Sequence, residues 1–432
     1  MDRYPGKDSR GLSAKGTFTP SPYSRAGRCL AGVMGLIFGR LLANSLPMIK
    51  LDEKELLNKA FNLTGLDDPG DPSFHEPLTF LLQSIEADAH LNPVGRLCFR
   101  SDILRMLCNR LRLQAERECH PRIADQVISR PIFITGLPRT GSTLLHALLA
   151  QDPASRAPRV WEVMHPCPPP QSGSYHRDPR VYKTARELKW LDFIMPGFKR
   201  VHMIGPRLPQ ECIAITGHSF ISYLFESMYF VDSYREWHER QDKRPAYEYH
   251  EKFLQHLQWR APGSHWVLKA PSHIFALETL RQVYPEARIV FTHRDPLEVL
   301  PSCASFTEML RGAFTRVIDR KKLGAEISRH WRKGARLEVE FSGRGDSRGP
   351  VFNVFYRDLV KNPLAVVRLL YKQFDMKLTK ETEEAIRRFL AQNPRNAHGV
   401  HRYSLEDYGL DRHAERRRFA FYTDFFSLDP VS

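Results

Sequence analysis

The 432-residue sequence has few cysteines, and those present are scattered. The seven Cys residues are odd in number and include no C-x-x-C pair, so neither a disulfide framework nor a zinc site is indicated. A reducing, cytoplasmic location is the simplest expectation. Acidic residues are also relatively scarce, with 49 Asp and Glu against 64 Lys and Arg and a net charge of +15. No nucleic-acid-binding motif accompanies this excess, which would suit an anionic membrane surface, an acidic molecule or simple solubility.

A long hydrophobic run is missing as well. Residues 29–39 are uninterrupted by charge, but Arg40 ends the run, whereas a membrane-spanning helix needs about 20 apolar residues. Residues 1–28 are rich in Ser, Gly, Pro and basic side chains and are predicted to be disordered. Residues 29–49 are therefore either a non-spanning helix or a targeting or anchoring element. In the second case they would provide peripheral membrane contact.

The remaining pattern predicts an α/β fold. Apolar residues recur at helical spacing from residue 51 to residue 118, and four short apolar runs from residue 131 onward are typical of buried strands. We expect these strands at residues 131–135, 266–270, 288–293 and 351–356. Strands that alternate with helices favour a parallel sheet with helices on both faces. The expected parts are an N-terminal extension (1–48), a helical lead-in (49–128) and an α/β domain (129–425).

The most informative segment follows the first strand. Residues 131–150 read PIFITGLPRTGSTLLHALLA, which places a loop bounded by Gly136 and Gly141 between a strand and a helix. Such a loop lets backbone N–H groups and a helix N-terminus converge on an anion. The glycine spacing is that of a nucleotide-triphosphate P-loop, but Ser142 stands where that motif requires Lys, and the cation is Arg139. The missing Lys argues against an NTPase or kinase.

The segment Pro-Arg-Thr-Gly-Ser-Thr, residues 138–143, resembles the 5′-phosphosulfate loop of the sulfotransferases that use 3′-phosphoadenosine 5′-phosphosulfate (PAPS). A second resemblance lies in residues 287–302, where Arg294 ends a strand and Ser302 follows eight residues later, as in the family's 3′-phosphate site. Without that resemblance, Arg294 and Asp295 would form an ordinary surface turn. Arg carries a planar fork of donors that matches phosphate oxygens.

Further motifs keep the family's order. Lys269-Ala-Pro271 resembles the Lys-x-Pro element whose Lys reaches the transferring group, Tyr356 ends a strand before Asn362-Pro363, and residues 398–404 resemble the C-terminal segment that closes over the nucleotide. The lead-in and Trp161-Glu162 are most similar to the bacterial-type branch, with a motif order shared by tyrosylprotein-type sulfotransferases. The resemblance implies donor binding by Arg139, Thr140, Gly141, Ser142, Thr143, Arg294, Ser302, Tyr356, His401 and Arg402.

The resemblance also implies metal-independent transfer of a sulfuryl group from PAPS to a hydroxyl. The candidate catalytic residues are Glu162, Lys269, Arg139 and His273. Glu162 is the expected general base, because it lies near the position of the catalytic Glu in tyrosylprotein-type enzymes. It could equally pair with Arg156 or Arg159 and be structural. The rival bases are His273, which could instead cap a helix, His165 and Glu211.

The acceptor is less well specified. We expect a small or lipid-like hydroxyl compound in a mainly apolar pocket, with residues 220–234 either forming a wall of that pocket or belonging to the core. The +15 charge would also suit an acidic macromolecule. Two other functions remain open at this point: a P-loop kinase or NTPase-like phosphotransferase, and a nucleotide-binding module without catalysis.

Overall fold

A five-stranded parallel sheet forms the centre of the computed structural model, which describes residues 51–345, 349–394 and 403–428. The strand order is β2-β3-β1-β4-β5, and every pairing is parallel. The strands are β1 (Ile132–Gly136), β2 (Ser155–Arg156), β3 (His265–Lys269), β4 (Arg288–His293) and β5 (Val351–Phe355). Each of the four predicted strands lies within one residue of its expected bounds. The two-residue β2 was not predicted, because it is too short to show a pattern.

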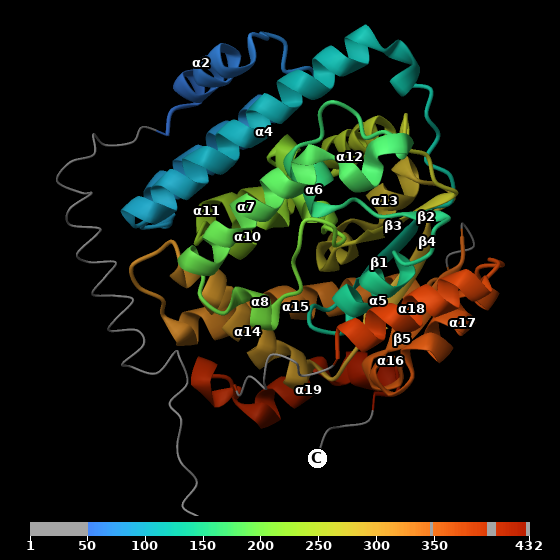
Figure 1. Ribbon diagram of the computed structural model, residues 1–432. Coiled ribbons are helices and arrows are strands. Elements are labelled where there is room, and N and C mark those ends of the chain that lie inside the picture. The colour runs from blue at the N-terminus through green and yellow to red at the C-terminus, as the bar shows by residue number, and fades with distance from the viewer. Residues whose placement is uncertain (1–50, 346–348, 395–402, 429–432) are drawn as a thin grey trace, which may run out of the picture. The chain divides into compact units, whose positions relative to one another are not determined.

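Alternating side chains of the sheet pack into different cores. Ile132 and Ile134 of β1 belong to the cluster formed with α5 (Ser142–Leu149), α17 (Pro363–Gln373) and α18 (Lys380–Gln392). Phe133 belongs to the cluster formed with α12 (Arg244–Gln258) and α13 (Leu277–Val283). Figure 1 shows helices on both sides of the strands. Successive side chains of the strands point to opposite faces of the sheet, and helices cover both faces, as is usual for parallel sheets. The predicted α/β architecture is confirmed.

The helical lead-in is also present. It consists of α2 (Glu53–Thr64), α3 (His75–Asp88) and the long helix α4 (Pro93–Cys119). Asn92 caps α4 by accepting a hydrogen bond from the backbone of Gly95, and Pro93 occupies the first helical position. These helices bury their apolar faces against α10 (Tyr223–Met228), α11 (Asp232–Arg240) and α14 (Pro296–Gly312), so the lead-in packs on elements that follow the first strands.

The other helices connect the strands or cover the sheet. They are α5 (Ser142–Leu149), α6 (Val160–Met164), α7 (Pro179–Ile194), α8 (Phe198–Val201), α9 (Cys212–Thr216), α10 (Tyr223–Met228), α11 (Asp232–Arg240), α12 (Arg244–Gln258), α13 (Leu277–Val283), α14 (Pro296–Gly312), α15 (Arg320–Gly343), α16 (Tyr356–Lys361), α17 (Pro363–Gln373), α18 (Lys380–Gln392) and α19 (Arg412–Phe425). None of the helices in the described ranges combines the length and apolar character needed to cross a lipid bilayer.

The topology places a crevice beside β1. The chain leaves β1 toward β2 and β3 on one side, and later continues to β4 and β5 on the other. In open parallel sheets, ligands bind outside the carboxyl ends of the strands where the strand order reverses. The segments after β1, β3, β4 and β5 all begin there, which brings the predicted site residues to one edge.

Candidate active site

The loop after β1 has the backbone of an anion cradle. Gly136, Arg139 and Gly141 have positive φ angles of 120°, 62° and 87°. A Cβ on Gly136 would lie 2.7 Å from the carbonyl oxygen of Thr292, and one on Gly141 would lie 2.8 Å from Leu359 Cδ2. Neither glycine can therefore be replaced without displacing a neighbour. Helix α5 begins directly after Gly141, so its first N–H groups border the loop.

The hydroxyl of Thr140 fixes the shape of this loop. Its Oγ1 lies 2.7 Å from the Leu137 carbonyl and 2.6 Å from Thr292 Oγ1, and the side chain is fully buried. Arg139 adopts a left-handed conformation that is costly for a residue with a side chain. The side chain of Thr140 thus positions the loop, whereas Arg139 lines a cleft.

The second predicted anion element lies against the first. Arg294 Nη1 donates to the backbone carbonyl of Arg139 at 3.1 Å, and Arg139 Nε donates to Ser302 Oγ at 3.2 Å. The Arg294 guanidinium also lies 4.2 Å from the centre of the Tyr356 ring. Asp295 caps α14 through the Leu297 N–H, as predicted for this helix start. The fold therefore joins residues from three separate sequence motifs in one cluster.

A cleft of about 1110 Å³ opens beside this cluster. Its lining includes seven of the predicted donor-binding residues: Arg139, Gly141, Ser142, Thr143, Arg294, Ser302 and Tyr356. The cleft extends past them to side chains that are mainly apolar, contributed by α7, α8, α10 and α14. His401 and Arg402 lie outside the described residues, so their predicted role stays a prediction.

Lys269 ends β3 and is buried behind the cleft lining, which does not include it. Its Nζ donates to Thr143 Oγ1 at 3.2 Å and forms an ion pair with Glu211, whose carboxylate lines the cleft. Burial raises the pKa of Glu211, but the positive charge of Lys269 and the hydrogen bond it donates outweigh that effect, so the pKa lies below its ordinary value. Burial lowers the pKa of His202 to about 4. At neutral pH the cleft therefore presents an ionised carboxylate, which is held from behind by the buried Lys269.

The structure places Glu162 away from the cleft lining. Its side chain is fully buried, with Oε1 2.5 Å from Arg156 Nη2 and Oε2 2.8 Å from the backbone nitrogen of Arg159. This second contact caps the start of α6. The structural alternative for Glu162, pairing with Arg156, is therefore the arrangement observed.

The two histidines considered as rival bases are also engaged elsewhere. His273 is buried behind β3, where its Nδ1 lies 2.6 Å from the Tyr247 hydroxyl, and burial holds its pKa well below the ordinary value. His165 pairs with Glu187 at 2.7 Å. Neither lines the large cleft. Of the four bases weighed from sequence, only Glu211 does.

Comparison with known proteins identifies this arrangement. The profile of the sulfotransferase family matches residues 131–381, more than half of the chain and including the loop, Lys269, Arg294 and Tyr356. The chain belongs to the sulfotransferase family. Sulfotransferases from Mycobacterium avium and Mycobacterium tuberculosis have similar solved structures, with TM-scores of 0.81 and 0.75, identities of 30% and 31%, and coverage of 89% and 85% of this chain and 99% and 98% of theirs.

The chain is also similar to curated bacterial relatives. An omega-hydroxy-beta-dihydromenaquinone-9 sulfotransferase is 23% identical over 333 residues, which cover 68% of this chain and 78% of the relative. It is found in Mycobacterium bovis and Mycobacterium tuberculosis. These similarities confirm the bacterial-type resemblance and show that the chain is a sulfotransferase enzyme, which decides against the phosphotransferase and the non-catalytic module. Enzymes of this family take their sulfuryl group from PAPS.

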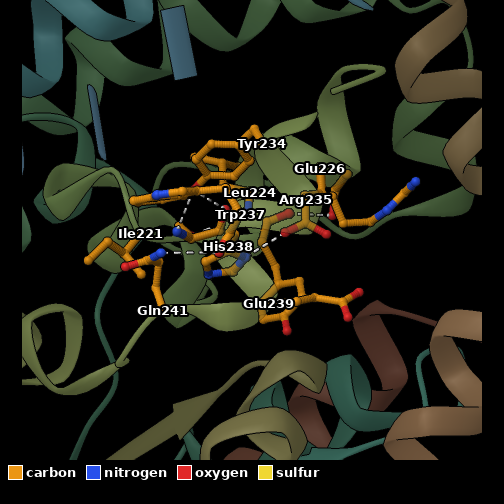
Figure 2. A network of polar contacts seen from close by, with 12 residues as sticks. Ile221, Leu224, Glu226, Tyr234, Arg235, Trp237, His238, Glu239 and Gln241 are labelled. Atoms are coloured by element: carbon orange, nitrogen blue, oxygen red, sulfur yellow. Dashed lines mark hydrogen bonds and ion pairs between the residues drawn. The ribbon is translucent and has the colours of Figure 1, made fainter. Parts of the chain in front are cut away.

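The far wall of the sulfotransferase cleft contains a network of buried charges. Glu226 Oε1 lies 2.5 Å from His238 Nδ1, and Figure 2 shows this pair between α10 and α11. Arg311 donates to both carboxylate oxygens of Glu326 at 2.9 and 2.7 Å and to the Glu226 carbonyl at 2.7 Å. The network ties α10 and α11 to α14 and α15, and thereby holds the wall in place.

The aromatic segment at residues 220–234 has a divided role. Phe220, Phe225, Tyr229 and Tyr234 are buried in the core with the lead-in helices. Tyr223 instead lines the cleft, beside Phe275 at a ring distance of 5.0 Å. The core interpretation therefore holds for most of the segment. Periodicity could not reveal the exception, because it depends on which helix packs against α10.

Proposed function

We propose that this sulfotransferase binds PAPS across the loop after β1 and the start of α14. Arg139, the backbone of residues 140–143 and the α5 N-terminus would hold the 5′-phosphosulfate, while Arg294 and Ser302 would hold the 3′-phosphate. The observation that carries this proposal is the hydrogen bond from Arg294 Nη1 to the Arg139 carbonyl, which joins motifs 155 residues apart in the sequence. Two anion elements in direct contact fit a ligand with two separate anionic groups.

The donor supplies an activated sulfuryl group; the protein must stabilise charge and accept a proton. Lys269 is buried at the end of β3, where its ammonium group can stabilise negative charge that develops during transfer. We assign the general base to Glu211, because it is ionised, lines the cleft and contacts Lys269. A carboxylate of low pKa serves as a base when the proton leaves late in the transition state.

Glu211 is a better candidate than Glu162 for a geometric reason. A general base must come within hydrogen-bond reach of the acceptor hydroxyl. Both carboxylate oxygens of Glu162 already have protein partners in the interior, and the cleft does not reach that residue. Catalysis by Glu162 would require breaking a buried ion pair, which is energetically expensive. His273 would likewise have to leave its buried contact with Tyr247.

We propose that the acceptor is a lipid-like or small apolar molecule with a hydroxyl group. The support comes from the cleft beyond Glu211, whose lining includes Met195, Phe198, Phe306 and Met309. This apolar part of the lining suits an apolar ligand, whereas Glu226 and Arg311 of the far wall are paired with other protein groups. The name of the curated mycobacterial relatives, which denotes sulfation of a hydroxylated dihydromenaquinone, agrees with this class.

Two experiments test this function. Isothermal titration should show tight, Mg²⁺-independent binding of 3′-phosphoadenosine 5′-phosphate (PAP), the desulfated donor, and weaker binding of ATP; tight binding that requires both ATP and Mg²⁺ would contradict the donor assignment. An extract screen with ³⁵S-labelled PAPS should then place the label in the organic-soluble fraction. Label confined to aqueous macromolecules would refute the acceptor class while leaving sulfotransfer intact.

A further inference from the structure

Helix α7 carries an unusual group of exposed aromatic side chains. Tyr182, Trp190 and Phe193 are 66%, 68% and 74% exposed. Within the described ranges, the exposed large hydrophobic residues include one other aromatic, Phe425 of α19. Exposing such rings to water is unfavourable by about 1.5–3 kcal/mol for each side chain that could be buried. A cluster of them on one helix therefore marks a surface with a partner.

These rings share one face with basic residues. With 100° per residue, positions 182, 186, 190 and 193 project to one side of α7, and positions 183 and 189 flank them. Lys183, Arg186 and Lys189 are all exposed. The two carboxylates of this part of the helix are engaged, because Glu187 pairs with His165 and Asp192 pairs with Lys199. The exposed face thus combines aromatic rings with net positive charge.

The opposite side of the same helix reaches the acceptor part of the cleft. Leu191 lines the cleft, as do Met195, at the end of α7, and Phe198 of the following helix α8. Figure 1 shows α7 continuing into α8 near α14, which supplies the opposite lining. A molecule bound by the aromatic face would therefore lie one helix diameter from the cleft, about 10 Å.

We propose that α7 docks the enzyme on an anionic lipid bilayer, with Trp190 and Phe193 inserted among the headgroups and Lys183, Arg186 and Lys189 facing anionic lipids. Trp and Phe on one face with Lys and Arg around them is the composition of helices that lie in the interface plane of a membrane. The positive charge selects an acidic surface, and the rings anchor the helix in it. The function of this face goes beyond sulfotransfer, because no step of the transfer uses these side chains.

Cosedimentation of the full chain with vesicles tests the proposal. Vesicles of phosphatidylcholine with phosphatidylglycerol should bind the protein, and vesicles of phosphatidylcholine alone should bind it much more weakly. The variants Trp190→Ser and Phe193→Ser should each reduce binding to the anionic vesicles about tenfold or more, the effect of losing one buried aromatic ring. Leu369→Ser is the matched control, because Leu369 is 58% exposed on α17.

Several results would overturn the proposal: no binding of the wild type to anionic vesicles, wild-type affinity in both α7 variants, or an equal loss in Leu369→Ser. Melting temperatures confirm that the variants fold. Titration with PAP separates this proposal from the proposed function, since the α7 variants should bind PAP as the wild type does. Loss of vesicle binding with normal PAP affinity supports the membrane face alone.

Discussion

Replacing Arg294 by Ala should weaken the binding of PAP selectively. The Arg294 side chain is 18% exposed and its geometry is fixed: Nε lies 2.9 Å from Glu298 Oε2, Nη1 donates to the Arg139 carbonyl, and the guanidinium stacks on Tyr356. Within the described residues, these contacts leave Nη2 for a ligand. Loss of a positioned charge pair costs about 2–4 kcal/mol. That cost corresponds to a loss of roughly 30-fold to 1000-fold in affinity.

The same variant should hardly affect the binding of adenosine 5′-monophosphate, because this nucleotide lacks the 3′-phosphate that Arg294 is assigned to hold. Titration calorimetry of both nucleotides into wild type and Arg294→Ala gives the comparison directly. Glu298→Gln is the control, since it removes the carboxylate that orients Arg294 but leaves the guanidinium in place. If Arg294→Ala weakens both nucleotides equally, the residue supports the loop through Arg139 and does not recognise the 3′-phosphate.

Lys269→Ala should lower kcat for sulfotransfer more than it raises the KM for PAPS, as expected of a group that acts mainly in the transition state; an unchanged kcat with weaker binding would make Lys269 a phosphate clamp. Glu162→Ala should lower the free energy of unfolding by about 3–5 kcal/mol in urea titrations, because it leaves Arg156 unpaired in the interior. Unchanged stability would contradict that role. Burial lowers the pKa of His146 to about 3, so this residue is neutral when folded but protonates below about 6.5 when unfolded. Lowering the pH from 7 to 5 should therefore reduce the free energy of unfolding by about 2 kcal/mol through His146. The variant His146→Gln should lose less stability over this pH range, and identical pH dependence of unfolding in the variant and the wild type would contradict this assignment.

The predictable parts of this protein are those with local patterns. The strands around the site are short apolar runs. The loop between Gly136 and Gly141 needs both glycines, because a Cβ at either position would clash with a neighbouring residue. The start of α14 at Asp295-Pro296 could likewise be predicted from the sequence, because a helix cap depends only on residues adjacent in the chain. Parallel strands then bring Arg139, Lys269, Arg294 and Tyr356 to one edge of the sheet.

The choice among the candidate bases, which the sequence leaves open, depends on three-dimensional contacts. Glu211 precedes α9, 58 residues before Lys269, and no local pattern distinguishes it from Glu162. Glu162 followed the expected spacing, but Arg156, six residues earlier, engages it in the interior. No sequence pattern indicates His202, because its place in the cleft depends on how α8 packs beside α14. Spacing thus identifies residues that the fold gathers in one cleft, but it does not choose among the candidate bases.

Transfer of label from ³⁵S-labelled PAPS to organic-soluble product, compared between wild type and Glu211→Gln, tests the central claim most directly. Gln is similar in size to Glu and can still contact Lys269, but it cannot accept a proton at neutral pH. We expect the variant to bind PAP with wild-type affinity and to transfer label about 100-fold or more slowly, the usual loss for a general base. Transfer at the wild-type rate would show that Glu211 is not the general base.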